Sequence, residues 1–137
     1  MPKLIKKYNL KTPSWESLLD NLNYSMYEGN SPHGIKHNPL GFFVTHEADK
    51  ISEVKEVLEK LDLNYAHLYL NLLINEETFG RHNDEVDVYF WQVQGISKWI
   101  FDEENYILEK GDLIIIPKGI YHDVKPLSPR AGISMSK

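Results

Sequence analysis

The chain divides into an N-terminal part with helical periodicity and a C-terminal part whose apolar residues come in short runs. Thr12 and Pro13 are typical of an N-cap and a first helical residue, and they predict a short helix through Leu22. The Gly- and Pro-containing stretch 24–39 has no steady period and predicts a loop. Asp49 is expected to cap a second helix, whose apolar residues recur at spacings of three and four. This amphipathic pattern places the second helix on the outside of a sheet.

From residue 65 onward, short β-rich runs alternate with turns that contain Gly, Asp, Asn or Pro. With one strand ahead of the second helix, the expected strands are 40–45, 65–74, 86–94, 98–101, 106–108, 113–116, 121–124 and 131–135. Short strands after a small helical lead fit a double-stranded β-helix, or jelly roll. The pattern predicts a mainly β, single-domain, cupin-like jelly roll over 1–137, with a helical and loop lead and an outer strand over 1–64 and the barrel core over 65–137.

The amino-acid composition limits the partners and the kinds of metal site that the chain can have. Lys and Arg number 15 against 20 Asp and Glu, and the net charge of −5 provides no basic field for a nucleic-acid backbone. The absence of cysteine excludes disulfides, thiolate-bound zinc and iron–sulfur clusters, so His and carboxylate groups must hold any metal. No apolar run has signal-peptide or membrane-spanning length. We expect a cytoplasmic protein with a small-molecule or peptide partner and with neither nucleic acid nor membrane, while homodimerisation stays open.

The strongest motif for function lies in residues 111–122. A strand is expected to end at Pro117, Gly119 permits a tight turn, and the chain returns as a strand that presents His122. The spacing G-x5-P-x-G-x2-H is that of the second cupin motif. It makes His122 the first candidate for a metal ligand.

His82 and Asp84 are two residues apart, which on a strand places them on the same face. A standard metal cupin has His at position 84 and Glu near position 88, where this chain has Asp84 and Val88. His82, Asp84 and His122 have the composition of the facial triad of non-haem Fe(II) oxygenases, whose three protein ligands leave the opposite face open. Zinc accepts the same ligands, and His82 and Asp84 alone could form a local hydrogen bond, so both alternatives remain.

Residues 82–99 resemble the metal-binding strand and hairpin of JmjC-type, cupin-fold 2-oxoglutarate oxygenases, especially the ribosomal-protein hydroxylases. The resemblance extends over about residues 65 to 135 and implies Fe(II) as cofactor and 2-oxoglutarate as cosubstrate. It also implies that O₂ is split to give succinate, CO₂ and a hydroxylated substrate. The chain departs from this family at Ser97, where those enzymes have the basic residue that holds the distal carboxylate of the cosubstrate. Lys98 is adjacent, but strand alternation turns it to the opposite face.

Residues 122–134 are similar to the ending of prolyl-hydroxylase-like 2-oxoglutarate enzymes, where an Arg on the last strand holds that carboxylate. Arg130 is therefore the first candidate, because a guanidinium grips a carboxylate with two hydrogen bonds and stays charged when partly buried. On a regular strand Gly132 and Ser134 share its face, so that Gly132 leaves room for a ligand and Ser134 adds a hydroxyl. Lys98 is the second candidate, and a surface role for Arg130 is the alternative.

One face of the 65–74 strand carries His67, Tyr69 and Asn71. If this face points into the barrel, Tyr69 and Asn71 could donate hydrogen bonds to a bound keto acid, while an ordinary half-exposed strand is the alternative. Tyr89 and Trp91 have the opposite parity to His82 and Asp84 and should pack between strands or under the helices.

These residues together predict an Fe(II)/2-oxoglutarate-dependent oxygenase that acts on a small molecule, an amino acid or a peptide. A zinc or manganese cupin acting as isomerase, lyase or hydrolase, and a non-catalytic ligand-binding cupin, are the alternatives, since one jelly roll hosts many functions. His33, His37 and His46 lie in the irregular N-terminal half and are expected to be solvated, with lid or ligand roles as the alternative.

Overall fold

The computed structural model describes residues 1–27, 41–73 and 78–137. Its helices are α1 (Trp15–Tyr27), the short 3₁₀ helix η1 (Ala48–Lys50) and α2 (Ser52–Leu61). Its strands are β1 (Lys3–Ile5), β2 (Phe42–Thr45), β3 (Tyr65–Asn71), β4 (Val88–Gln94), β5 (Ser97–Ile100), β6 (Asn105–Leu108), β7 (Leu113–Ile116), β8 (Asp123–Pro126) and β9 (Arg130–Ser136).

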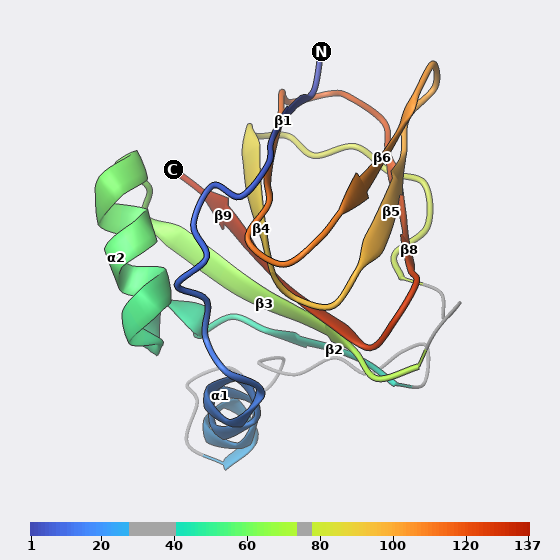
Figure 1. Cartoon of the computed structure of the whole chain (residues 1–137). Coiled ribbons are helices and arrows are strands. Elements are labelled where there is room, and N and C mark those ends of the chain that lie inside the picture. Colours follow the sequence, from blue (N-terminus) through green and yellow to red (C-terminus); the bar gives the residue numbers. More distant parts are fainter. Residues whose placement is uncertain (28–40, 74–77) are drawn as a thin grey trace.

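Two antiparallel sheets form the molecule (Figure 1). The larger sheet has the order β1-β7-β4-β9-β3-β2, and the smaller has the order β6-β5-β8. Neighbours in the large sheet are far apart in sequence, so the chain crosses repeatedly between the two sheets, as it does in a jelly roll. The predicted fold is therefore confirmed: the protein is mainly β, with its helices ahead of the β-rich half.

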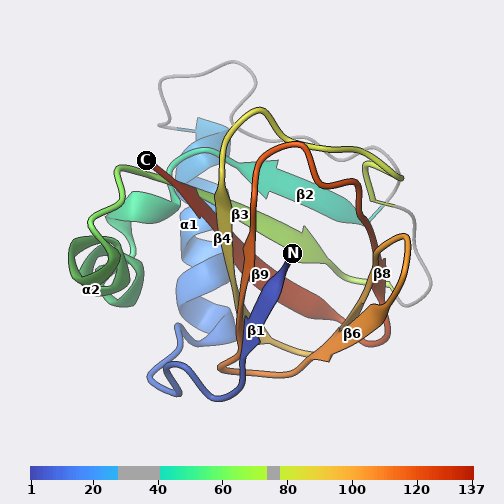
Figure 2. The same ribbon diagram turned by 90° about the horizontal axis from the view of Figure 1, so that it is seen from above.

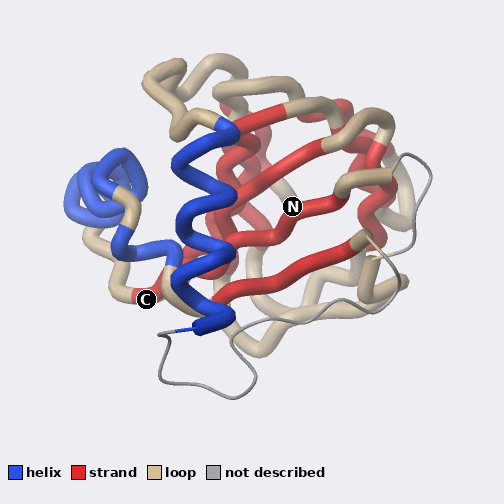
Figure 3. Tube along the Cα trace, turned by 90° about the horizontal axis from the view of Figure 1, so that it is seen from below, coloured by secondary structure: helices blue, strands red, loops and turns tan. Residues whose placement is uncertain are grey.

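The helices cover the outer face of the large sheet (Figure 3). Trp91 and the half-buried Tyr89 of β4 pack on this side with Leu18 of α1 and Val54 of α2, as their parity predicts. Phe90, between them in sequence, points the other way into a second apolar cluster that joins the two sheets. Alternation along one strand thus separates a structural core under the helices from the space between the sheets.

Helix α1 begins later and runs further than the sequence pattern predicts. The Ser14 hydroxyl accepts a hydrogen bond from the Ser17 amide at 3.1 Å, so Ser14 and not Thr12 caps the first turn. The helix continues to Tyr27 and so includes the first four residues of the stretch where the pattern predicts a loop from Tyr24. The remainder of that stretch, 28–39, lies outside the described residues.

The prediction that Asp49 caps the second helix is wrong. Asp49 lies within η1, and α2 has Ile51 at its N-cap position without a side-chain cap hydrogen bond. Burial of Ile51 with Val54 and Leu58 fixes this start, so packing outweighs the capping preference. The expected position of α2 outside the sheet is confirmed. Within the described residues, neither α1 nor α2 has the length and apolar character of a membrane-spanning helix.

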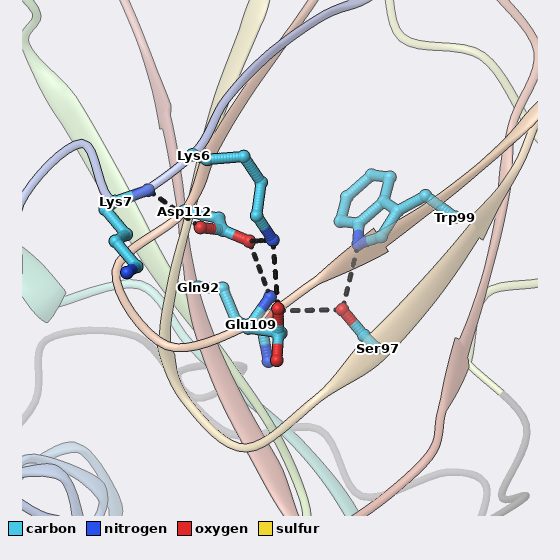
Figure 4. Close-up of polar contacts among 7 residues, drawn as sticks. All are labelled: Lys6, Lys7, Gln92, Ser97, Trp99, Glu109 and Asp112. Atoms are coloured by element: carbon cyan, nitrogen blue, oxygen red, sulfur yellow. Dashed lines mark hydrogen bonds and ion pairs between the residues drawn. The ribbon is translucent and has the colours of Figure 1, made fainter.

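Strand β1 is absent from the expected elements, although it closes one edge of the large sheet beside β7. Asp112, which is 1% exposed, holds the residues after β1 in place (Figure 4). Its carboxylate accepts hydrogen bonds from the Lys7 amide at 2.9 Å and the Glu109 amide at 2.8 Å, and pairs with the Lys6 ammonium. Residues 65–74 form a strand only as far as Asn71, and the strand expected at 121–124 is shifted to β8.

Candidate metal centre

Two segments outside the regular strands bring His82, Asp84 and His122 together. His82 and His122 form an isolated antiparallel bridge, in which each amide donates to the other's carbonyl at 2.9 and 2.8 Å. The amide of Gly119, at φ +83°, donates to the Asp84 carbonyl at 2.9 Å. The turn of the 111–122 motif therefore holds the 82–84 segment against the start of β8. Among the described residues, these three form the one group of three or more potential metal ligands, with their ligand atoms within 4.8 Å of one another.

The ring orientations leave the same nitrogen free on both histidines. Nδ1 of His82 lies 2.8 Å from the Gly80 carbonyl oxygen, and Nδ1 of His122 lies 2.9 Å from the Ile120 carbonyl oxygen. A carbonyl only accepts, so each Nδ1 carries the proton and each Nε2 keeps a lone pair. Both Nε2 atoms face the Asp84 carboxylate, at 3.8 Å for His82 and 3.4 Å for His122. Carbonyl-bound imidazoles of this kind are typical of metal-ligating histidines.

Burial differs within the triad. The His122 side chain is 4% exposed and stacks on the Trp99 ring at 5.7 Å, whereas those of His82 and Asp84 are 33% and 34% exposed. Burial is the largest influence on His122 and lowers its pKa, which keeps the imidazole neutral and available as a ligand. The site therefore has one enclosed ligand and two at an opening.

Two imidazoles and one carboxylate fit a divalent metal that retains open coordination positions. The expectation that His82 and Asp84 share the face of a strand is wrong in detail. His82 makes a single bridge, Asp84 lies in irregular structure, and β4 begins only at Val88. The two side chains nevertheless converge, because backbone hydrogen bonds to the 119–122 turn hold both residues.

A small pocket with a cavity volume of about 30 Å³ opens beside the triad, between the two sheets. Its walls combine aromatic rings with a few polar groups, and it contains three of the predicted cosubstrate residues, Tyr69, Arg130 and Ser134. The other lining residues are Phe42, Thr78, Phe79, His82, Asp84, Val88, Phe90, Trp99, His122 and Val124.

Arg130 is the cationic side chain among the described lining residues of this pocket other than the histidines, and it is 1% exposed. Its Nε donates to Oδ1 of Asn71, its cross-strand neighbour, at 2.7 Å, and its guanidinium lies over the Phe90 ring at 5.8 Å. Nη1 is buried without a hydrogen-bond partner, and no carboxylate among the described residues forms an ion pair with Arg130. Burial lowers the pKa of Arg130 to about 10, so the group remains charged at neutral pH. Arg130 is thus a buried core residue and not a surface arginine.

Of the other residues predicted to contact the ligand, two line the pocket and one lies behind the pocket wall. Tyr69 and Ser134 line the pocket, and burial raises the pKa of Tyr69. Asn71 is fully buried and holds Arg130, while its Nδ2 has no partner. The expected space for a ligand at Gly132 is absent, because a Cβ there would lie 2.1 Å from the Phe90 ring. Glycine at this position admits an aromatic ring instead.

Lys98 does not belong to the described lining of the pocket. It lies on β5 opposite Ile107 and Lys125, with the parity that alternation predicts. Ser97 is buried, and its hydroxyl donates to Gln92 at 2.8 Å and accepts from the Trp99 indole at 3.0 Å (Figure 4). The position that carries the basic residue in JmjC-type enzymes therefore supports Trp99, which stacks on a candidate ligand.

Sequence reasoning missed Phe42, Thr78 and Phe79. The Phe79 ring, in a residue 47% exposed, makes edge contacts with Phe42 at 5.2 Å and with Tyr69 at 5.5 Å. The Thr78 hydroxyl donates to the Val124 carbonyl at 3.0 Å and ties this segment to β8. No periodicity marks these residues, because they belong to irregular structure or to the short edge strand β2.

The histidines of the N-terminal half lie outside the candidate site or outside the described residues. His33 and His37 lie outside the described residues. His46 is exposed, as expected, and its ring contacts His67 of β3 at a distance from the pocket lining. His67 shares the parity of Tyr69 along β3 but does not reach the pocket.

The two antiparallel sheets and the crossovers between them define a double-stranded β-helix, or jelly roll. No family model and no curated protein matches the sequence. Solved structures do match. YcfD, a ribosomal oxygenase from Escherichia coli, in complex with cobalt and 2-oxoglutarate has a TM-score of 0.72 at 14% identity, over 98% of this chain and 47% of that one.

Two further YcfD structures agree. One superimposes with a TM-score of 0.75 at 15% identity, over 98% of this chain and 46% of that chain. The complex with cobalt and succinic acid has a TM-score of 0.71 at 16% identity, over 99% of this chain and 48% of that chain. The chain therefore spans about half the length of the structures that it matches, and at this identity the likeness shows the fold.

Proposed function

We propose that the protein is an Fe(II)- and 2-oxoglutarate-dependent oxygenase. His82, Asp84 and His122 would hold the metal, and Arg130 would bind the distal carboxylate of 2-oxoglutarate. Tyr69 and Ser134 line the same pocket, so they would contact the bound keto acid.

The observation that carries this proposal is a buried cation, Arg130, that forms no ion pair with any described carboxylate and lines the same pocket as the candidate metal-ligand triad. An uncompensated buried charge costs several kcal/mol, and proteins keep such groups where a ligand completes them. Arg130 Nη1 and Asn71 Nδ2 are two buried donors without acceptors. A carboxylate would satisfy a cation and a donor at once, and the candidate metal ligands line the same pocket.

When bound, Fe(II) and 2-oxoglutarate supply O₂-dependent hydroxylation, with release of succinate and CO₂. The chain's own residues would bind and orient the reactants. His122 presents a neutral Nε2, Arg130 fixes the far end of the cosubstrate, and the Phe90 and Trp99 rings exclude water from the enclosed wall. The exposed sides of His82 and Asp84 leave the opening to the second substrate.

For the prime substrate we propose only a chemical class, which is a small molecule, an amino acid or a peptide. The YcfD structures support the cosubstrate, since one contains cobalt with 2-oxoglutarate and another contains cobalt with succinic acid. We further propose that the protein acts without nucleic acid or membrane, and that any self-association is a homodimer.

Calorimetric titration of the anaerobic Fe(II) protein with 2-oxoglutarate tests the proposal. We expect binding that requires the metal, and slow formation of succinate from 2-oxoglutarate when O₂ and ascorbate are added. The His122→Ala variant is the control and should lose both signals. The absence of binding at millimolar 2-oxoglutarate would overturn the proposal and favour a zinc or manganese cupin, whose chemistry the same ligands allow.

A further inference from the structure

A second pair of histidines lies outside the pocket. His46 directly follows β2, and His67 belongs to β3, the strand that pairs with β2 (Figure 2). Their Nδ1 atoms are 2.9 Å apart, and the ring centroids are separated by 4.8 Å with an angle of 84° between the planes. The same type of nitrogen on both rings therefore lies at hydrogen-bond distance from its counterpart.

The distance between these nitrogens matches adjacent ligands of a tetragonal metal ion. With metal–nitrogen bonds of about 2.0–2.1 Å, a separation of 2.9 Å corresponds to an angle of about 90° at the metal. A tetrahedral zinc ion would hold the two nitrogens about 3.3 Å apart at the same bond length. Square-planar or tetragonal coordination by nitrogen and oxygen is the preference of Cu(II) and Ni(II).

We propose that His46 and His67 form a second metal site, which binds Cu(II) or Ni(II) through both Nδ1 atoms and is independent of the triad. Water fills the remaining coordination positions. The alternative is a simple hydrogen bond in which one Nδ1 donates to the other, and titration with Cu(II) separates the two.

Access and charge fit this assignment. His46 is exposed, so an ion and its waters can reach the pair, while His67 is partly buried and fixed by its strand. Burial, followed by the influence of His46, lowers the pKa of His67, so its lone pair is available at neutral pH. The Asp49 carboxylate acts on His67 in the opposite direction, which places a negative group near a bound cation.

The site is close to the pocket but separate from it. His67 faces Ser134 across the β3–β9 pairing, and the Ser134 side chain belongs to the pocket wall. A metal on His46 and His67 joins the end of β2 to β3 and should stabilise this edge of the large sheet, because an ion that binds the folded state alone raises stability by mass action.

Titration with Cu(II) in the His122→Ala background isolates this site, because that variant lacks the enclosed triad ligand. We expect one Cu(II) per chain, an electron paramagnetic resonance spectrum with two imidazole nitrogens, and a rise in melting temperature on addition of the metal. The His46→Gln change, at an exposed position, should weaken binding at least tenfold and remove the rise.

The same His46→Gln change in the parent protein checks the result without relying on the His122 variant. Cu(II) stoichiometry should fall from two ions per chain to one. Equal Cu(II) affinity with and without His46, or a spectrum with a single nitrogen, would overturn the proposal and leave the pair as a hydrogen bond. The triad proposal is unaffected by either result, since His82, Asp84 and His122 are unchanged in the parent comparison.

Discussion

Replacement of Arg130 by Met separates the effect of the buried cation on folding stability from its proposed effect on 2-oxoglutarate binding. Met preserves much of the side-chain volume and removes the charge, which no anion among the described residues balances. If Arg130 exists to bind a carboxylate, the variant should fold normally and lose 2-oxoglutarate. A structural arginine would give the opposite result, with a less stable protein and no specific effect on the ligand.

The magnitudes follow from the local environment. Burial lowers the pKa of Arg130 from its usual value to about 10, which corresponds to about 3 kcal/mol against the charged form in the folded state. Because both values lie above pH 7, this cost is fully present at neutral pH and is relieved only as the pH rises through 10. Met removes it but leaves Asn71 Oδ1 without its donor, which costs about 1–3 kcal/mol. The two terms nearly cancel, so the free energy of unfolding should change by less than about 2 kcal/mol.

Ligand binding has no such compensation. A charge-assisted hydrogen bond contributes about 1.5–3 kcal/mol, so Arg130→Met should weaken 2-oxoglutarate about ten- to a hundredfold at unchanged metal content. Urea unfolding and anaerobic calorimetry measure the two quantities, and Lys98→Met is the matched control. Unchanged affinity in the Arg130 variant would refute the reasoning. Loss of affinity in the Lys98 variant alone would place the carboxylate at the JmjC-like position.

Three further changes test other contacts. His122→Ala should abolish Fe(II) and Mn(II) binding at the triad, since it removes the enclosed ligand, and undiminished Fe(II) or Mn(II) content by metal analysis would contradict the triad. The folded-state pKa of His67 lies below its usual 6.5, so the folded protein resists protonation there and stability should decline as the pH falls below 6.5. His67→Asn should reduce that decline in urea unfolding at pH 7.5 and 5, and an identical slope would exclude the histidine as its source. Gly132→Ala should lower stability by about 1–3 kcal/mol through its clash with Phe90, and Phe90→Leu should restore part of this loss; a thermal melt unchanged by Gly132→Ala would show that the ring moves freely.

The parts that could be predicted from sequence share a local cause. Alternation indicated the strands of the C-terminal half and the two faces of β4, because each residue's side is opposite to that of its neighbour. The 111–122 spacing located His122, because Gly119 needs a positive φ and the turn sets the direction in which the chain returns. The Arg130 assignment rests on a resemblance, and alternation placed Lys98 on the other face correctly.

The parts that could not be predicted depend on tertiary packing. Strand β1 has three residues and no pattern of its own, and it exists because β7 offers an edge and Asp112 holds the segment after β1. Asp49 has the right chemistry for a helix cap, but burial of Ile51 places the start of α2 two residues later. The Phe90 ring fills the space beside Gly132, and Phe90 lies on a different strand. Each case depends on contacts between residues that are distant along the chain.

The candidate site combines two kinds of support. The triad lies on segments held by few backbone hydrogen bonds, with His82 and His122 in a single bridge, so its geometry can adjust to a metal. Arg130 lies in β9, which is paired on both sides along most of its length, and its buried position is therefore fixed. In the proposed complex, Arg130 would fix the position of one carboxylate, and the triad could adjust to the other end of the ligand. If Arg130 binds a carboxylate as proposed, the charge that disfavours the ligand-free fold is also the group that would select the ligand.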